Sequence, residues 1–464
     1  MFFFVKLKSI FRNIKSIMNN WNLIKIPKYG KIGFMTLLFP LSLLAQQKVQ
    51  DSLLQQATLE NCIHYAIQKN PDLQNAAIAE DINETIIKSK LAEWYPQINF
   101  NYDLQYNFQL PTININGNLI HSGSVNTSSV QFGATQNIFN RDVLLASRTS
   151  KDVRLLSKQT TKEQNINIAV LVSKAFYDVI LTIQQIKVTE EDIRRIDISL
   201  KDAYYQYQSG ITDKTDYKRA TISLNNAKAQ KKSSDESLKA KYATLKELMG
   251  YPPSNDIELL YDTAQLAKEI FIDTLQNISY SNRIEVQLLE TQKKLQQYNL
   301  QYYKWSFLPD VSAFGNYNLN FQNNQFTKLY HQTYPNSYAG ILLSLPIFQG
   351  GKRLQQIKQA QLQITQVDNY IISFQNKINT QYQQAMAAYK SNLYNYFSLK
   401  ENLDLANEVY DVIRLQYRAG VKTYLEVISS ETDLRTAQIN FYNALYELLA
   451  SKIDVSQSLG NINY

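Results

Sequence analysis

The sequence is poor in the residue types on which most enzyme and metal sites depend. Its 464 residues include one cysteine, Cys62, and three histidines that lie far apart in the chain, His64, His121 and His331. A single cysteine excludes an intramolecular disulfide, and its amphipathic surroundings predict a buried thiol. No glycine-rich phosphate loop, nucleophile elbow or Cys/His pair stands out. We therefore expect neither an enzyme nor a metal or cofactor site.

Excess positive charge is confined to the N-terminal segment. The formal net charge is +8, but residues 1–45 contain seven lysines and arginines and no acidic residue, so the remainder carries +1. A nearly neutral chain gives no electrostatic reason to expect nucleic-acid binding. Three lysines precede a short apolar run, Ile32–Leu44, and the small residue Ala45, which is typical of a signal peptide over residues 1–45. An uncleaved anchor is the alternative, although the run is short for a membrane-spanning helix.

Long apolar runs, proline and glycine are rare in much of the remaining chain. We find no run of transmembrane-helix length beyond residue 45. Arg141–Met249 contains no proline and one glycine, Gly210, and Lys352–Leu459 contains no proline and one glycine, Gly420. Such sequences predict helical hairpins that turn at each glycine, and the first helix, Arg141–Gln208, would be about 100 Å long.

Other segments show alternating polarity. From Ile98 to Leu110 every second side chain is apolar or aromatic, and those between are Asn, Gln or Asp. This alternation predicts a β-strand with one apolar and one polar face. A similar run surrounds Phe132. At about 3.3 Å per residue, the first strand is long enough to cross a bilayer. A strand of a soluble β-sandwich is the alternative.

The second half of the chain repeats features of the first. Pro309 repeats Pro96, and Gly420 repeats Gly210, at nearly constant spacing. Each half is therefore predicted to contain a helix, two strands, a long helix and a return helix. We assign residues 46–250 to the first repeat, 251–276 to a linker or equatorial segment, and 277–464 to the second repeat.

Four strands of this kind are too few to close a membrane sheet. An open sheet edge in lipid leaves backbone groups without hydrogen-bond partners, and single-chain membrane barrels begin at about eight strands. Several copies of the chain would therefore share one barrel. The predicted fold is mostly α-helical with a membrane β-barrel contribution, built from internally duplicated helix–strand–strand–helix–helix units.

With this order of elements the chain resembles the TolC-type outer-membrane efflux proteins over roughly residues 58–462. The resemblance rests on four motifs: Asn70-Pro71-Asp72-Leu73, Trp94-Tyr95-Pro96-Gln97, Leu345-Pro346-Ile347-Phe348 followed by Gly350-Gly351-Lys352, and Tyr417-Arg418-Ala419-Gly420-Val421 followed by Leu425-Glu426-Val427. It implies a homotrimeric channel-tunnel, with a twelve-stranded barrel in outer-membrane lipid and a periplasmic α-helical tunnel. It also implies that a periplasmic adaptor protein and an inner-membrane transporter act with the channel, which itself catalyses nothing.

The resemblance further implies a gate at the periplasmic tips of the tunnel. By position relative to the hairpin turns at Gly210 and Gly420, the matching gate residues are Asp216, Tyr417, Lys422 and Glu426. Lys422 stands where an arginine is found in the best-known member, which keeps the charge but loses the planar fork. We expect ion pairs of Lys422 with Glu426 or Asp216 to hold the tips closed. Alternatively, these are ordinary exposed helix charges worth less than about 1 kcal/mol each, and Tyr417 is a packing residue.

Two functions from different classes are compatible with the sequence. The first is the exit duct of a tripartite efflux or type I secretion system, and the sequence does not separate small-molecule cargo from protein cargo. The second is a structural or adhesive periplasmic coiled-coil protein whose strands form a soluble sheet. The second function predicts a protein that is extracted without detergent.

Overall fold

The computed structural model describes Leu54 and residues 56–462, so the predicted signal peptide over residues 1–45 lies outside the described residues. The helices are α2 (Leu59–Lys69), α3 (Pro71–Ala92), α4 (Arg141–Gln208), α5 (Lys214–Met249), α6 (Thr263–Leu266), α7 (Ile284–Trp305), α8 (Lys352–Arg418) and α9 (Tyr424–Leu459), with short 3₁₀ helices η1 (Tyr280–Asn282) and η2 (Phe326–Lys328). The strands are β1 (Gln97–Tyr106), β2 (Thr112–Ile115), β3 (Asn118–His121), β4 (Asn126–Phe139), β5 (Asp310–Asn323) and β6 (Tyr334–Ser344).

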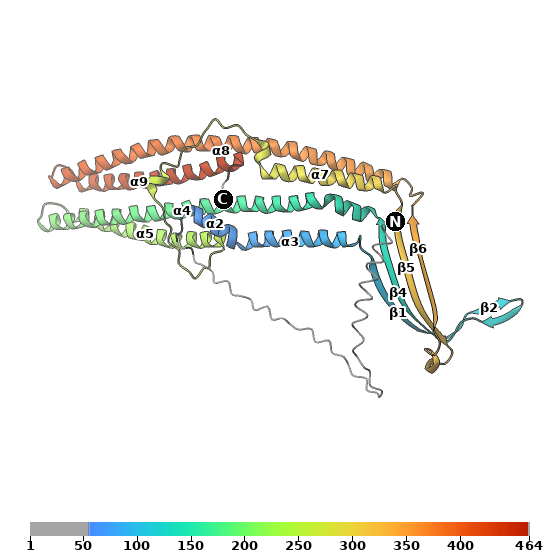
Figure 1. The fold of residues 1–464 in the computed structure, drawn as a ribbon. Coiled ribbons are helices and arrows are strands. Elements are labelled where there is room, and N and C mark those ends of the chain that lie inside the picture. Colours follow the sequence, from blue (N-terminus) through green and yellow to red (C-terminus); the bar gives the residue numbers. More distant parts are fainter. Residues whose placement is uncertain (1–53, 55, 463–464) are drawn as a thin grey trace. The chain divides into compact units, whose positions relative to one another are not determined.

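Each of the two longest helices turns back at its end into a shorter helix. α4 contains 68 residues and α8 contains 67, whereas α5 and α9 contain 36 each. α5 packs along α4, and α9 packs along α8 (Figure 1). The predicted limits of the first helix, Arg141–Gln208, are confirmed. Neither proline nor glycine interrupts this helix, and the Asn140 side chain caps its N-terminus by accepting a hydrogen bond from the Asp142 N–H at 2.8 Å.

One helix does meet a length and hydropathy criterion for crossing a membrane, which corrects our expectation that no such run follows residue 45. An 18-residue window of α4 reaches a mean hydropathy of 1.7, and half of that window is buried within the protein. Buried core helices meet the same criterion. Val172, Phe176 and Val179 of α4 lie in the largest hydrophobic core. Packing inside the protein therefore explains the apolar window of this helix.

The shorter helices of the first half meet end to end beside α4. Both α3 and α5 pack on α4, and the end of α5 contacts the junction between α2 and α3. A Cβ atom on Gly250 would lie 2.5 Å from the carbonyl oxygen of Lys69, so only glycine fits there without movement. Asn70 completes the junction, because its Oδ1 caps α3 and its Nδ2 donates to the carbonyl oxygen of Leu248 at 2.8 Å.

The four longer strands form one antiparallel sheet in the order β1-β4-β5-β6. One row of register partners across this sheet consists of amides only: Asn101, Gln131, Asn318 and Asn336. The adjacent row, on the opposite face, contains Phe100, Phe132 and Tyr317. Asn318 Nδ2 donates to Asn336 Oδ1 at 2.7 Å, and the rings of Phe100 and Phe132 lie 5.3 Å apart. The sheet therefore has the polar face and the apolar face that the alternation predicts.

The connection between β1 and β4 contains a hairpin that we did not expect. We predicted four strands in the whole chain and a first strand that extends to Leu110. β1 instead ends at Tyr106. The Asn107 N–H still donates to the carbonyl oxygen of Val125 at 2.7 Å, in register with the pairing of β1 and β4, and after this bond the chain leaves the sheet (Figure 1). β2 and β3 pair on either side of Asn116–Gly117, where both residues have the positive φ of a type I′ turn. The described residues thus contain six strands.

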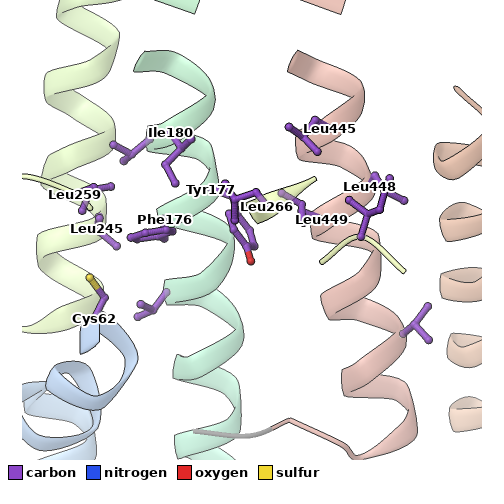
Figure 2. Packing of buried hydrophobic residues seen from close by; sticks show 14 of the residues in the cluster. Cys62, Phe176, Tyr177, Ile180, Leu245, Leu259, Leu266, Leu445, Leu448 and Leu449 are labelled. Atoms are coloured by element: carbon purple, nitrogen blue, oxygen red, sulfur yellow. The ribbon is translucent and has the colours of Figure 1, made fainter. Parts of the chain in front are cut away.

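The largest hydrophobic core lies where α2, α4, α5, α8 and α9 approach one another (Figure 2). Cys62 is fully buried there, as predicted, and burial raises the pKa of its thiol to about 12, which keeps the thiol protonated. The segment 251–276, which we expected to be a linker, contributes Leu259 to the same core. Tyr389 of α8 fixes this segment, because its hydroxyl donates to the carbonyl oxygen of Ile270 at 3.0 Å.

Candidate functional site

The turns between α4 and α5 and between α8 and α9 lie side by side, at the ends of the helices remote from the sheet (Figure 1). Gly210 and Gly420 sit at equivalent positions in these turns, with φ angles of +71° and +74°. Each glycine donates its N–H to the carbonyl oxygen three residues earlier at 3.0 Å. A Cβ atom at either position would meet nothing within 4 Å. The left-handed backbone, rather than lack of space, therefore favours glycine at both tips.

Lys422 and Glu426 form an ion pair that stays within one hairpin. Lys422 Nζ lies 2.6 Å from Glu426 Oε1, and Glu426 Oε2 accepts hydrogen bonds from the N–H and the hydroxyl of Thr423 at 2.9 and 3.0 Å. The contact with Lys422, followed by the bonds from Thr423, lowers the pKa of Glu426 to about 2. Because these three residues lie in one turn at the start of α9, the pair fixes the shape of that turn and does not join the two hairpins.

Tyr417, in contrast, connects the two hairpins. Its side chain is 7% exposed, and its hydroxyl donates to Gln206 Oε1, near the end of α4, at 3.0 Å. Its ring lies 5.7 Å from the ring of Tyr424 at the start of α9. Burial, with a smaller effect from the charges of Asp216 and Asp202, raises the pKa of Tyr417 to about 12. Tyr417 thus acts as a neutral hydrogen-bond donor across the space between hairpins.

Asp216 lies in the first turn of α5 and is half-buried. Within the described residues its carboxylate forms no ion pair, so the pairing with Lys422 that we considered is absent and Lys422 binds Glu426 alone. Asp216 is nevertheless close enough to raise the pKa values of Tyr417 and Tyr424 by its charge. Among the described residues, Asp216 is therefore a carboxylate near the tip that forms no ion pair.

Further from the tips, α4 and α9 share a group of buried ionisable side chains that the sequence analysis missed. Glu431 is 3% exposed and accepts a hydrogen bond from the Ser199 hydroxyl at 2.9 Å. Asp192 is 1% exposed and lies 3.4 Å from Arg435 Nη1 and 3.6 Å from Arg195 Nη2. Burial raises the pKa of Glu431 to about 7 and also raises that of Asp192, against the effect of the arginines.

A sequence signal for Glu431 does exist. Tyr424, Val427 and Leu434 are buried at helical spacing on one face of α9, and Glu431 falls on the same face. An acidic residue in an apolar helical stripe is unusual and predicts a buried partner. That partner, Ser199, lies far away in the sequence, and no local pattern points to it. The same holds for Gln206, the partner of Tyr417.

The described part of the chain offers no site for a metal. It contains no group of three or more His, Cys, Asp or Glu side chains with the arrangement of a metal site. His121 lies in β3, where its Nδ1 is 3.2 Å from the hydroxyl of Thr112.

Comparisons with known proteins agree with this geometry. The model of a family described as outer membrane efflux protein matches residues 62–251 and 278–461. The chain is 24% identical to the alkaline protease secretion protein AprF of Pseudomonas aeruginosa over 70% of this chain and 67% of the relative. It is 21% identical to the outer membrane protein TolC of Vibrio cholerae over 92% of this chain and 96% of the relative.

A solved structure shares the fold. The crystal structure of the open state of the MtrE outer membrane channel of Neisseria gonorrhoeae superimposes with a TM-score of 0.70. The match covers 87% of this chain and 88% of that chain, at 18% sequence identity. The long helical hairpins and the four-stranded sheet therefore belong to a known architecture.

Proposed function

Because this chain belongs to the outer membrane efflux protein family, we propose that three copies of it form one gated exit duct for efflux or secretion. The family match confirms the resemblance found in the sequence, and it places the protein in the outer membrane with a helical tunnel in the periplasm. The structural relatives are channels rather than enzymes. The trimer, the gate and the cargo are the parts of this function that we infer.

The observation that carries the proposal is the open four-stranded sheet. β1 and β6 each pair with a neighbour on one side only among the described strands. An unpaired backbone group in lipid costs several kcal/mol, so neither edge is tolerable within a membrane. Pairing β1 of one copy with β6 of the next satisfies both edges. Three copies then close a barrel of twelve strands, with four from each chain.

The two faces of the sheet fit the two environments of such a barrel. Ile98, Ile341 and Leu343 share the apolar face and are 77%, 71% and 62% exposed in the single chain. Lipid would cover these side chains. The row of amides that includes Asn101 and Gln131 lies on the opposite face and would line a water-filled lumen.

We place the gate at the tips of the two hairpins. The hydrogen bond from Tyr417 to Gln206 holds the α8 tip against the α4 tip, and the Lys422–Glu426 pair shapes the turn beside it. Three Asp216 carboxylates, one from each copy, would surround the narrow end and favour the passage of cations. Release of the contact between Tyr417 and Gln206 would allow the hairpins to separate.

A duct in the outer membrane needs partners to receive its cargo. We propose a periplasmic adaptor protein and an inner-membrane transporter, as the sequence resemblance implies. One relative is named as a protease secretion protein, so the proposed cargo includes proteins as well as small molecules. The family model matches residues 62–251 and 278–461 separately. This supports our assignment of residues 46–250 and 277–464 as two equivalent repeats joined by residues 251–276.

Single-channel conductance of the purified protein in a planar bilayer tests this function. We expect low conductance for the wild type and an increase for Tyr417→Phe, which keeps the ring and removes only the hydrogen bond to Gln206. A neutral hydrogen bond of about 1 kcal/mol changes the ratio of open to closed states by roughly fivefold per chain. Tyr205→Phe is the matched control, because Tyr205 is an exposed tyrosine near the same tip.

Three results would contradict parts of the proposal. High conductance in both the wild type and Tyr417→Phe would retain the duct and refute the gate. Equal, low conductance in the two proteins would also refute a gate at Tyr417. A protein that is extracted without detergent and conducts nothing would favour the structural or adhesive coiled-coil function instead.

A further inference from the structure

The contact between α4 and α9 is lined by polar side chains at intervals along both helices. Three contacts follow one another toward the tips: Lys174–Asp454, Gln185–Asn443 and Ser199–Glu431, at 2.5, 2.9 and 2.9 Å. As the residue number rises along α4 it falls along α9, so the helices are antiparallel at this contact. Because α4 belongs to one hairpin and α9 to the other, these contacts join the two hairpins of a single chain.

The contacts become more buried toward the tips. Asp454 is 41% exposed at its side chain, whereas Glu431 is 3% exposed and the side chain of Asp192 is 2% exposed. A carboxylate is stable in such surroundings only if it is paired, hydrogen-bonded or protonated. Asp192 has two arginines close by, but Glu431 has one hydrogen bond, from Ser199, and no ion pair among the described residues.

The groups that face Glu431 come from the helices packed around it. They are Asp192, Arg195 and Ser199 of α4, Tyr410 and Arg414 of α8, and Tyr424 of α9. Behind them, Arg435 of α9 binds Asp192, and Asp216 of α5 acts on Tyr424. Burial is the largest influence and raises the pKa of Glu431 to about 7, and the charge of Asp192 acts in the same direction. The Ser199 hydrogen bond and the arginine charges of Arg195 and Arg414 lower it.

We propose that the Ser199–Glu431 and Asp192–Arg435 contacts form a second latch between the hairpins, distinct from the tip contact of Tyr417. The latch holds while Glu431 is protonated. It weakens when Glu431 is charged, because burial of the carboxylate costs more than its one hydrogen bond from Ser199 returns. This inference rests on the proposed channel function. The latch acts within one chain, so it resists separation of α4 from α9 without involving the contacts between copies.

The direction of the pH effect follows from the two environments of Glu431. When the hairpins separate, Glu431 is exposed to water and regains a pKa near its usual value of 4.5. The closed state therefore binds the proton more tightly than the open state. Its additional stability is fully present below pH 4.5 and is lost as the pH rises through about 7. Over this range the ratio of open to closed chains rises by up to roughly two orders of magnitude.

The test is the open probability of the channel in a planar bilayer between pH 5 and pH 8. We expect the wild type to open increasingly as the pH rises. Glu431→Gln keeps the size of the side chain and the bond from Ser199 but cannot ionise, so it stays closed across the range. Asp433→Asn is the matched control, because Asp433 is an exposed acid on the same helix, and we expect it to behave as the wild type does.

Two further variants separate a latch from a merely structural role. Ser199→Ala removes a hydrogen bond that lowers the pKa of Glu431, so the midpoint of the pH response should move up. Asp192→Asn removes a charge that raises it, so the midpoint should move down. Opposite shifts support the latch. The same pH response in Glu431→Gln and the wild type, or no response in the wild type, overturns it.

Failure of the latch is distinguishable from failure of the channel. If Tyr417→Phe conducts at any pH, but the wild type and Glu431→Gln show the same pH response, the duct is retained and the latch is refuted. If neither Tyr417→Phe nor any Glu431 variant conducts at any pH, the channel function itself fails, and the latch fails with it.

Discussion

Tyr424 shows how a single hydroxyl group can act against the packing of the hairpin tips. Its side chain is 1% exposed, and its hydroxyl has no hydrogen-bond partner among the described residues. Burial raises the pKa of this phenol well above its usual range, so the group remains neutral. A buried hydroxyl without a partner costs about 1–3 kcal/mol. The packed tips therefore contain a buried hydroxyl that would gain a hydrogen bond from water if the hairpins separated.

We expect Tyr424→Phe to stabilise the folded protein by about 1 kcal/mol, because it removes the unsatisfied hydroxyl and keeps the ring beside Tyr417. Thermal unfolding of the detergent-solubilised protein would measure the effect. Tyr417→Phe is the contrasting variant, since the Tyr417 hydroxyl is bonded to Gln206 and its loss should destabilise the folded protein. A lower melting temperature for Tyr424→Phe would show that the hydroxyl has a partner that this arrangement does not reveal.

At the scale of elements, the junction of α5 with α2 and α3 depends on one glycine. We expect Gly250→Ala to destabilise the protein by more than the ~1–2 kcal/mol of a left-handed alanine, because its Cβ also meets the carbonyl oxygen of Lys69. Gly210→Ala has a similar φ but open space, so it measures the backbone effect alone. Equal losses of melting temperature in the two variants would mean that the close approach at Gly250 has no cost.

The long helices were predictable in detail because their signals are local. An uninterrupted run between Arg141 and Gln208, with a capping asparagine before it and a glycine turn after it, defines both ends of α4. The end of β1 was not predictable in this way. The polarity pattern continues to Leu110, but the pairing with β4 that defines the strand stops near Asn107 and Val125, which local sequence does not indicate. Asn116–Gly117 did carry a local signal for a hairpin turn, which a search for that dipeptide would have found.

The candidate site also contains both contacts that are local in the sequence and contacts that are not. Lys422 lies in the turn just before α9 and Glu426 lies in the first turn of α9, so they are four positions apart and their pairing is local. The contacts that join the hairpins, Tyr417 with Gln206 and Glu431 with Ser199, link residues more than two hundred positions apart. Spacing within the sequence cannot pair such residues; only the folded arrangement of α4, α8 and α9 brings them together.

At the scale of the assembled molecule, adjacent residues of β4 should respond oppositely to the same charge. Gln131 lies in the row of amides and Phe132 in the aromatic row on the other face. Phe132→Lys would place a cation in lipid at a cost of about 2–4 kcal/mol per copy, whereas Gln131→Lys would face water. We expect trimer in the outer-membrane fraction to fall for Phe132→Lys and to remain for Gln131→Lys. The reverse result would exchange the lumen and lipid faces.

The end-to-end meeting of α3 and α5 has a mechanical consequence. In the first half of the chain, α4 is one continuous helix of 68 residues. Beside it, the shorter helices α3 and α5 meet at Gly250 and share no ladder of backbone hydrogen bonds there. Bending is easiest where α3 and α5 meet, because bending there breaks no hydrogen bond within either of these two helices. We therefore expect a displacement at the α4–α5 turn to bend this half of the chain near Gly250 and to leave α3, next to the sheet, in place.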